Sequence, residues 1–550
     1  MSTGAAAHSA DDLPATSTWA PLHQSAFRNL WIASFASNVG TWMQTVGAQW
    51  LLIDQHAGPT LIALVQTASS LPVVLVTLPA GVVAEFLDRR RLLVGVQAFQ
   101  TVVAAILSVL TVTGHTDAVV LLMFTFLLGC GGAAGLPAYQ ALVPDLVPRG
   151  QISQSATLSS LGVNLARAVG PALAGVLLTR LGVGGLFALN AASFVVFAVA
   201  LLAAPAQPHR RGRPTGFLTS FVAGGRYVRN APVVRRLLLW LVVFAVPGNV
   251  LWALLAPIAN QRLVLGSTGY GILLAAAGAG AVIGALWLGP LRRWLAPSAL
   301  LAIATGVYGG AMIVVGLSRN AVLTIIVLLP AGVAWIVVIA GLNSATQAFL
   351  PAWVRARALS IYQIVLFTSS AVGAALWGVV AQWVGLVTAF VLAGAVLMLA
   401  AAGGALRWPL ITPLSADRRA ISYWPDPPDI TESSTGPVLV VVRYKVPEAH
   451  RAAFVRALPA LRRSRLRTGA TSWQIHRDTT GAEFVEHYEQ VSWADHLEQH
   501  HERLTEADRT IQQRVTAETD SAPVVEHLLA VDLDSNEPPG GVSAVDSANP

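Results

Sequence analysis

Cysteine and lysine are almost absent from this chain of 550 residues. Cys130 is the single cysteine, so no intrachain disulfide can form, and its place among glycines indicates a small packing residue. Lys445 is the single lysine, which leaves arginine to carry nearly all of the positive charge. Charged residues make up only 11% of the chain and hydrophobic residues 54%, a balance that points away from an ordinary soluble protein and toward the membrane.

The hydrophobic residues gather in twelve stretches, each near the roughly 20 residues that a helix needs to cross a bilayer. These stretches predict a polytopic, all-α membrane protein embedded in the lipid bilayer. Their approximate bounds are 27–51, 61–84, 92–113, 118–140, 152–179, 184–204, 237–259, 271–289, 298–317, 321–348, 358–380 and 385–406.

Arginine is distributed asymmetrically between the connecting loops. Alternate loops are rich in arginine, whereas the opposite loops hold only Arg180, Arg262 and Arg319. The positive-inside rule therefore predicts a multi-pass protein of the cell inner (plasma) membrane with both termini in the cytoplasm. The net charge of +7 follows from this bias and does not indicate nucleic-acid binding. Residues 1–26 lack the basic start and apolar core of a signal peptide.

Changes in composition divide the chain into seven parts. They are a cytoplasmic tail (1–26), an N-terminal six-helix half (27–204), a basic cytoplasmic central loop (205–236), a C-terminal six-helix half (237–406), a linker (407–436), a soluble domain (437–532) and a disordered tail (533–550). In the central loop, apolar residues at helical spacing from Phe217 to Val222 predict either an amphipathic helix on the inner headgroups or a solvated basic linker.

The soluble domain shows the periodicities of a small α+β fold. Residues 438–446, 471–477, 483–491 and 523–531 read as strands, and 447–467 and 493–516 as helices. The order βαββαβ predicts a ferredoxin-like domain on the cytoplasmic side.

The membrane part contains an internal repeat. Residues 168–176 (AVGPALAGV) return 203 residues later as 371–379 (AVGAALWGV), with seven of nine positions identical. The same offset relates Gly81 to Gly284, Arg89 to Arg292 and Arg90 to Arg293. Two copies of one hydrophobic half are typical of transporters, in which the halves rock about a site between them.

The loop after the second stretch resembles the glycine–acid–basic signature of the major facilitator superfamily. Its glycine is Gly81, its acids are Glu85 and Asp88, and its basic residues are Arg89 and Arg90, although Glu85 stands where aspartate is usual and Asp88 where glycine is usual. The resemblance implies a twelve-helix transporter in which these residues hold one conformation. The alternative is that Arg89 and its neighbours only anchor the loop to the inner leaflet.

In the fifth stretch, Gly170 and Pro171 resemble the glycine–proline signature of the superfamily's exporters, where proline bends the helix and glycine lets another helix approach. The phrases at residues 27–31, 38–44, 71–72 and 164–167 are similar to the branch that includes the enterobactin exporter and the transmembrane secretion effectors. The soluble domain resembles the dimeric α/β barrel family that includes cofactor-free monooxygenases, which implies homodimerisation through this domain.

Polar side chains in the stretches predict the substrate site. Asn38, Trp42, Thr45 and Gln49 share one helix face. Arg167 is a fixed charge deep in a stretch, either as an anion contact facing the translocation path or as a group satisfied by helix-end carbonyls. The other candidates are Asn164, Asn249, Trp252 and Asn343, each of which can instead form an interhelical hydrogen bond.

Aspartate, glutamate and histidine are missing from the interior of every stretch, so coupling to a proton is implied by the superfamily and not by the residues. Asp54, Glu85 and Asp88 are the remaining relay candidates. In the soluble domain His496 and His500 are spaced as a zinc pair, but no third ligand follows at a convincing spacing, so we predict no metal. Nothing indicates a cofactor, a nucleotide loop or catalytic residues.

These features predict a secondary transporter, an antiporter that exports an amphipathic small molecule such as a siderophore or a drug-like compound. One alternative is a membrane-tethered enzyme whose C-terminal domain oxidises or binds a small molecule. Another is a receptor or scaffold that does not transport.

Overall fold

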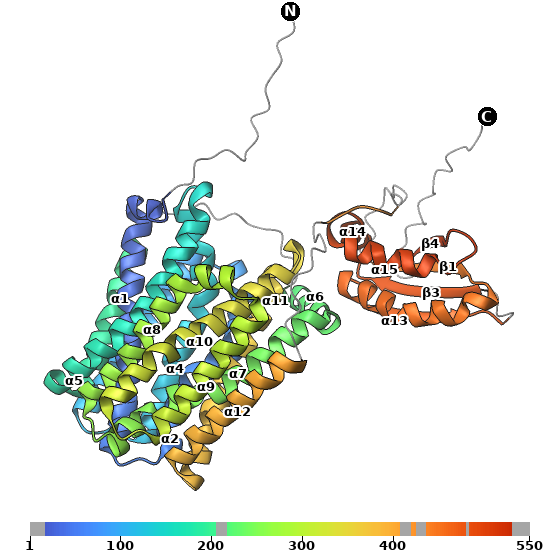
Figure 1. Ribbon diagram of the computed structural model, residues 1–550. Helices are drawn as coiled ribbons and strands as arrows, with labels where there is room; N and C mark the ends of the chain where they lie inside the picture. Colours follow the sequence, from blue (N-terminus) through green and yellow to red (C-terminus); the bar gives the residue numbers. More distant parts are fainter. Residues whose placement is uncertain (1–16, 205–216, 408–419, 425–435, 480–482, 531–550) are drawn as a thin grey trace, which may run out of the picture. The chain divides into compact units, whose positions relative to one another are not determined.

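The computed structural model describes residues 17–204, 217–407, 420–424, 436–479 and 483–530 (Figure 1). The predicted tails and the linker lie largely outside the described residues. Two compact units divide the chain: Met1–Phe217, Leu239–Leu342 and Gln363–Thr412 form the first, and Leu218–Leu238, Asn343–Tyr362 and Pro413–Pro550 form the second. Each unit is described by itself.

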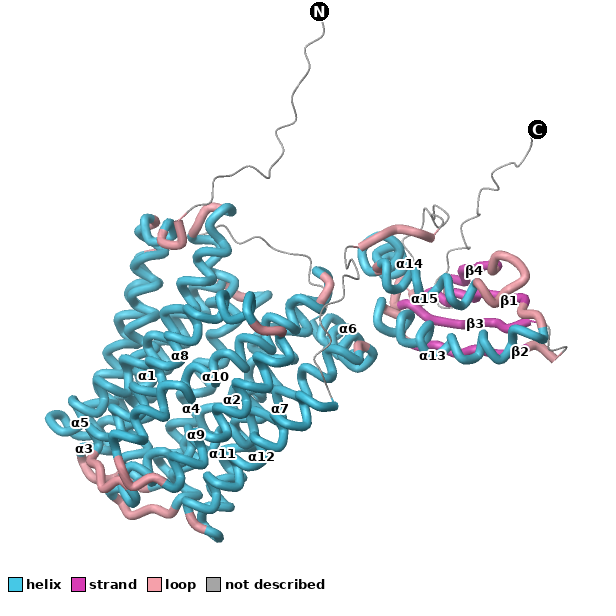
Figure 2. The backbone as a smooth tube through the Cα atoms, viewed as in Figure 1, coloured by secondary structure: helices cyan, strands magenta, loops and turns pink. Residues whose placement is uncertain are grey.

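Long helices make up the membrane part (Figure 2). They are α1 (Ser25–Asp54), α2 (Pro59–Phe86), α3 (Arg89–Val112), α4 (Ala118–Leu142), α5 (Ile152–Ala203), α6 (Phe217–Asn230), α7 (Pro232–Pro257), α8 (Ser267–Trp294), α9 (Pro297–Leu317), α10 (Ala321–Phe349), α11 (Ala352–Val384) and α12 (Leu386–Arg407). Short 3₁₀ turns lie at Ala20–His23, Val143–Leu146 and Arg149–Gln151, and a π turn at Ile258–Arg262 follows α7. The predicted all-α membrane fold is confirmed.

The twelve predicted stretches map onto eleven of these helices because α5 carries two of them. The chain reverses within α5 at Gly182, whose φ of 66° lies in the left-handed region that glycine adopts without strain. Ten of the described helices are long and apolar enough to cross a membrane. The 30-residue α1 is not among them, and polar side chains such as Asn38, Gln44 and Gln49 interrupt its apolar residues. Counting α1 once and α5 twice restores twelve passages.

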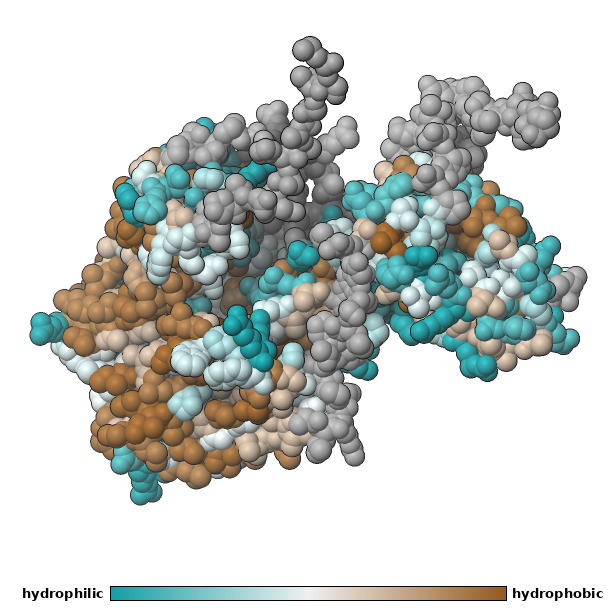
Figure 3. Space-filling model, turned by 45° about the horizontal axis from the view of Figure 1, so that its top comes forward, coloured by the Kyte–Doolittle hydropathy of each residue, from teal (hydrophilic) through white to brown (hydrophobic). Residues whose placement is uncertain are grey.

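The face of the membrane part drawn in Figure 3 is largely apolar, with smaller hydrophilic patches. Large aliphatic side chains of the membrane part are strongly exposed, among them Val109, Val199 and Leu399. Such a surface is favourable in contact with lipid. In water it would be unfavourable, because exposing apolar area costs about 25 cal/mol of free energy per Å².

The internal repeat builds equivalent helix contacts in both halves. Gly170 packs against Trp42 of α1, and its repeat partner Gly373 packs against Val246 of α7, the first helix of the other half. Five residues further on, the carbonyl oxygen of Gly175 accepts a hydrogen bond from Thr268 of α8 at 2.8 Å. The Gly378 carbonyl oxygen accepts one from Thr60 of α2 at 3.1 Å. Each copy therefore packs within its own half and also joins the other half.

The C-terminal domain contains a four-stranded antiparallel sheet. Its elements are β1 (Val438–Lys445), a 3₁₀ turn (Glu448–His450), α13 (Arg451–Thr468), β2 (Ser472–Arg477), β3 (Glu483–Gln490), α14 (Trp493–Glu498), a π turn (Gln499–Arg503), α15 (Glu506–Thr516) and β4 (Val524–Leu529). The strand order is β2-β3-β1-β4, which is the ferredoxin-like order predicted from the sequence. Val440 lies opposite both Tyr488 and His527.

The helices of this domain cover one face of the sheet. Alternate residues of β1, such as Val440 and Tyr444, pack there against Phe454 and Leu458 of α13. The prediction of one helix over 493–516 is wrong, because the chain breaks at Leu504 and restarts at Thr505. The Thr505 hydroxyl and the Asp508 carboxylate form a reciprocal capping box that begins α15.

Candidate functional site

Arg167 lies between two tryptophans that come from different halves of the repeat. Its guanidinium carbon is 5.7 Å from the ring centroid of Trp42 on α1 and 5.8 Å from that of Trp252 on α7. The two rings are themselves 5.9 Å apart. All three side chains are partly buried. Each such cation–π contact contributes about 0.5–2 kcal/mol, depending on desolvation.

Further aromatic rings extend this arrangement into the second half. Trp335 of α10 lies 5.7 Å from Trp252 and 5.5 Å from Tyr308 of α9, and Phe244 of α7 lies 5.4 Å from Trp335. Trp335, Tyr308 and Phe244 were not predicted, because an aromatic ring in an apolar helix gives no sequence signal that separates a binding site from the core. We call Trp42, Trp252, Trp335, Tyr308 and Phe244 the aromatic cage.

Arg167 makes no ion pair within the described residues, and its buried Nε has no hydrogen-bond partner there. No described carbonyl oxygen accepts a hydrogen bond from it, so the predicted alternative of helix-end carbonyls has no support. An uncompensated charge inside a membrane costs several kcal/mol. A negatively charged group bound beside Arg167 would therefore stabilise its guanidinium.

Gln49 connects the two halves beside the cage. Its side-chain nitrogen donates to the carbonyl oxygen of Trp252 at 3.1 Å, and its side-chain oxygen accepts from the hydroxyl of Tyr270 on α8. Gln49 and Trp252 are 203 residues apart, which is also the offset of the repeat. Equivalent positions of the two halves touch only near the axis that relates them, so the cage lies close to that axis.

The remaining predicted site residues make mostly local contacts. Asn38, Thr45 and Asn164 each donate to a carbonyl oxygen four residues earlier in their own helix, at 2.7, 3.0 and 2.9 Å. Asn249 donates to Ser370, the repeat partner of Arg167, at 3.2 Å. Asn343 belongs to the second unit, where its side-chain oxygen accepts from Gln347 at 2.5 Å.

The predicted gating loop forms a contact that the sequence did not reveal. Asp88 caps α3 by accepting from the backbone of Arg91 at 2.8 Å. Arg89 donates to the carbonyl oxygen of Ala141 at 3.1 Å and to the carboxylate of Asp145 at 3.0 Å. Asp145, absent from the prediction, is thus the acid that pairs with this loop. Gly81 and Glu85 belong to the end of α2, and their side chains lie outside the described residues.

Arginines at the same repeat position act alike in the two halves. Arg292 donates to the carbonyl oxygen of Ala340 on α10 at 3.5 Å, as Arg89 does to Ala141 on α4. Arg90 donates to the carbonyl oxygen of Leu202, at the end of α5.

In α5 itself, Gly170 and Pro171 allow neighbouring helices to approach closely on two sides. A methyl group added to Gly170 would lie 2.5 Å from Cβ of Trp42, and one added to Gly271 of α8 would lie 2.6 Å from the Pro171 carbonyl oxygen.

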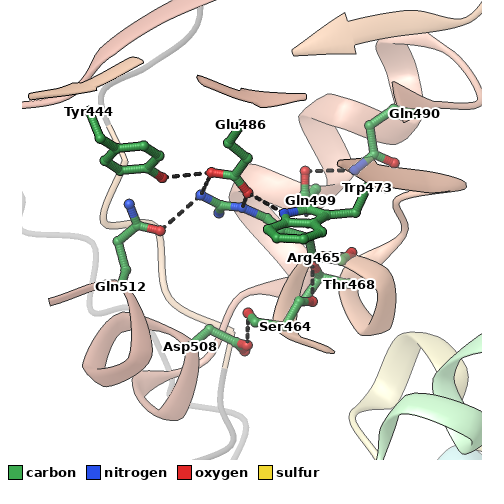
Figure 4. A network of polar contacts seen from close by, with 10 residues as sticks. All are labelled: Tyr444, Ser464, Arg465, Thr468, Trp473, Glu486, Gln490, Gln499, Asp508 and Gln512. Atoms are coloured by element: carbon green, nitrogen blue, oxygen red, sulfur yellow. Dashed lines mark hydrogen bonds and ion pairs between the residues drawn. The ribbon is translucent and has the colours of Figure 1, made fainter. Parts of the chain in front are cut away.

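A buried polar network lies under the sheet of the C-terminal domain (Figure 4). The Glu486 carboxylate accepts from Arg465 at 2.9 Å, Tyr444 at 2.6 Å and Trp473 at 2.7 Å. Burial alone would lower the pKa of Arg465, but the adjacent Glu486 raises it well above its usual value. Trp473 therefore serves as a hydrogen-bond donor to a structural ion pair.

Three histidines come together at another place in this domain, which corrects the expectation that the His496–His500 pair lacks a third metal ligand. His527 of β4 completes the group, and the potential ligand nitrogens all lie within 4.8 Å of one another. The sequence could not show this, because β4 reaches α14 only through the fold. Burial, followed by the proximity of His500 and His527, lowers the pKa of His496 from 6.5 to about 3.

Two repeated halves that meet at a polar and aromatic centre, within a bundle of membrane-crossing helices, define a transporter of the major facilitator superfamily. Residues 16–535 match the family of transmembrane secretion effectors, and the chain belongs to that family. The match spans the membrane part and the C-terminal domain alike.

Named relatives are transporters. The multidrug efflux pump Tap of Mycolicibacterium fortuitum is 25% identical over 372 residues, which cover 65% of this chain and 90% of Tap. The enterobactin exporter EntS of Escherichia coli O1:K1 / APEC is 30% identical over 257 residues, which cover 46% of this chain and 60% of EntS.

A solved structure supports the fold. It is a bacterial homologue of the human lysosomal transporter Spinster in an inward-facing, unoccupied conformation, with a TM-score of 0.59 and 16% identity over 71% of this chain and 98% of that chain. At this identity the likeness concerns the fold alone.

Proposed function

We propose that this protein exports an amphipathic, anionic aromatic small molecule, of the siderophore or drug-like class, by alternating access coupled to protons. The observation that carries the proposal is Arg167 held between Trp42 and Trp252, one ring from each half. The names of the relatives Tap and EntS agree with this direction of transport and this range of substrates.

The chemistry of the cage favours such a substrate. A guanidinium without a carboxylate partner attracts an anion, and indole and phenol rings stack on planar apolar surfaces. A carboxylate or phenolate bonded to Arg167 would supply the missing charge, with a charged hydrogen bond contributing about 1.5–3 kcal/mol. Hydrogen bonds from Gln49 and Asn249 would help to orient the substrate.

The contacts between the halves suit alternating access. Three hydrogen bonds join the two halves: Thr268–Gly175, Thr60–Gly378 and Gln49–Trp252. In the predicted topology they lie near the extracellular ends of the helices. With both termini in the cytoplasm, these bonds close the extracellular side. We place the gating role at the α2–α3 loop, where the Arg89–Asp145 pair is exposed enough to break and re-form.

Substrate charge is the sharpest test. Paired compounds that differ only in a carboxylate or its methyl ester would be assayed for efflux by cells expressing the wild type, Arg167→Ala or Arg167→Lys. We expect Arg167→Ala to lower efflux of the carboxylates by about 10-fold or more, as the loss of a charged hydrogen bond implies. The esters are expected to change little. Arg180→Ala, at an exposed site of the same helix, is the matched control.

Coupling is tested separately in proteoliposomes. Collapsing the proton gradient with a protonophore is expected to abolish concentrative transport, while exchange across the membrane continues. Unchanged carboxylate efflux in Arg167→Ala would overturn the substrate assignment. Concentrative transport that persists without a proton gradient would overturn the coupling.

A further inference from the structure

Three histidines from two elements of the C-terminal domain converge at one point. His496 lies on α14, and His500 follows one helical turn later in the adjoining π turn. His527 enters from β4, the edge strand of the sheet. The ring centroids of His500 and His527 each lie 4.7 Å from that of His496.

Buried ring nitrogens of His496 and His527 lack hydrogen-bond partners within the described residues. His496 is fully buried, and neither of its ring nitrogens has a hydrogen-bond partner within the part of the chain that the structure describes. Nε2 of His527 is likewise without one. A buried polar group without a hydrogen-bond partner costs about 1–3 kcal/mol, so the cluster without a ligand would destabilise the domain.

We propose that His496, His500 and His527 bind a divalent transition-metal ion of the zinc type. Three neutral imidazoles are a ligand set that zinc, and also copper, nickel and cobalt, accept in proteins. Three protein ligands leave at least one coordination position for water or for an oxygen donor of a small molecule.

The separations are compatible with this role. Nitrogens bound at the usual 2.0–2.1 Å to one tetrahedral ion would lie about 3.3 Å apart. The observed nitrogens lie within 4.8 Å of one another, so side-chain rotations of the three rings bring them to coordination distance without a change of fold. Trp493, whose ring lies 5.3 Å from His496 and 5.5 Å from His527, closes one side against water.

Nearby positive charges are neutralised by carboxylates. Arg465 pairs with Glu486 at 2.9 Å, and both side chains are buried. Arg503 pairs with Asp495 at 2.5 Å and also with Glu498. Both of these arginines therefore have carboxylate partners that offset their charge.

Bound metal would fasten the last strand to the helical layer. β4 pairs only with β1 and ends the described sheet, whereas α14 belongs to the other layer. Coordination by residues of both elements joins them through one ion. The domain is then expected to lose stability when the metal is removed.

The test uses the full chain in detergent, purified with a tag that contains no histidine. Metal content is measured by mass spectrometry, and cobalt(II) is titrated into chelator-treated protein while its visible ligand-field absorption is followed. We expect one ion per chain and a tetrahedral cobalt spectrum. His496→Gln and His527→Gln are expected to weaken cobalt binding by more than about 100-fold, beyond the 10–100-fold effect of a residue outside the coordination shell.

Two variants serve as controls. His501→Gln removes an exposed histidine beside the cluster, and His487→Gln removes one of a two-histidine pair whose rings lie 5.2 Å apart. Both are expected to bind cobalt as the wild type does. Hydrogen exchange of the β1 and β3 amides verifies folding, and His527→Gln, on the edge strand, decides the matter if His496→Gln misfolds. Absence of a cobalt spectrum in the wild type, or equal binding by His527→Gln, would overturn the proposal.

Discussion

Two glutamates of the C-terminal domain pair with arginine in opposite surroundings. Glu486 and Arg465 are almost completely buried, whereas Glu506 and Arg509 of α15 are about half exposed, with side-chain accessibilities of 46% each. A buried charge that loses its partner keeps the full cost of its desolvation, while an exposed charge returns to water. The same chemical change therefore has very different consequences at the two sites.

We expect Glu486→Gln to destabilise the C-terminal domain by about 3–5 kcal/mol, because Arg465 would remain buried without a carboxylate. Glu506→Gln, in the exposed pair with Arg509 on α15, is the matched control, with an expected loss below about 1 kcal/mol. Hydrogen-exchange protection of the β1 and β3 amides in the full-length protein measures both. Equal losses for the two variants would contradict this account of the network.

Packing between helices depends on glycines that no other residue can replace. Gly271 of α8 lies against α5 so closely that an added methyl group would fall 2.6 Å from the Pro171 carbonyl oxygen and 2.9 Å from Cα of Gly175. Both neighbours are backbone and cannot rotate away. Gly289, on the same helix, has open space around it.

Gly271→Ala is expected to separate α5 from α8 and to lower transport by about 10-fold or more, since overpacking costs about 1–3 kcal/mol. Gly289→Ala is expected to leave transport and expression unchanged or slightly improved, because alanine favours the helix. Transport rates corrected for the amount of protein in the membrane give the comparison. A normal rate in Gly271→Ala would show that the α5–α8 contact tolerates separation.

The sequence predicted elements better than the contacts between them. Hydropathy located the helices, since a lipid-facing segment must be apolar along its whole length, and strand periodicity gave the βαββαβ order. The break at Thr505 was missed although Thr505 and Asp508 have capping-box spacing, because the helical pattern continues across it. Arg167, Trp42 and Gln49 were found as polar or charged exceptions in apolar helices.

Other site residues carry no such exception. Trp335 and Tyr308 resemble core residues until the fold brings them beside Trp252. Asp145 and His527 each act on a partner that is distant in the sequence, Arg89 for the first and His496 for the second. Contacts of this kind follow from the tertiary structure and cannot be derived from spacing along one chain.

The uncovered face of the C-terminal sheet has consequences for assembly. Leu439 and Leu528 alternate with the core residues of β1 and β4 and therefore lie on the face away from the helices, which Val524 and the Arg443–Glu526 pair share. Val524 and Leu528 are 56% and 50% exposed. A sheet face with these side chains is costly to leave in water, so we propose that it pairs with the same face of a second chain.

Leu528→Arg is accordingly expected to shift the detergent-solubilised protein from dimer to monomer, because the charge would be buried in the interface. Val455→Arg, at a 50% exposed site on α13, is the matched control and is expected to remain dimeric. Light scattering coupled to gel filtration gives the mass of each. A wild-type protein that is monomeric at all concentrations would refute the interface.

The aromatic cage has a consequence for how efficiently the proposed transporter would use the proton gradient. In the proposed alternating-access cycle, Trp42 moves with the first half and Trp252 with the second, so rotation of the halves uncovers one face of Arg167. In a carrier without substrate, that step breaks a cation–π contact worth about 0.5–2 kcal/mol and leaves the charge of Arg167 without a partner. A loaded carrier keeps the charge neutralised by its cargo. In the proposed cycle, slippage, which is the movement of an empty carrier that dissipates the gradient, is therefore resisted by the two rings beside Arg167.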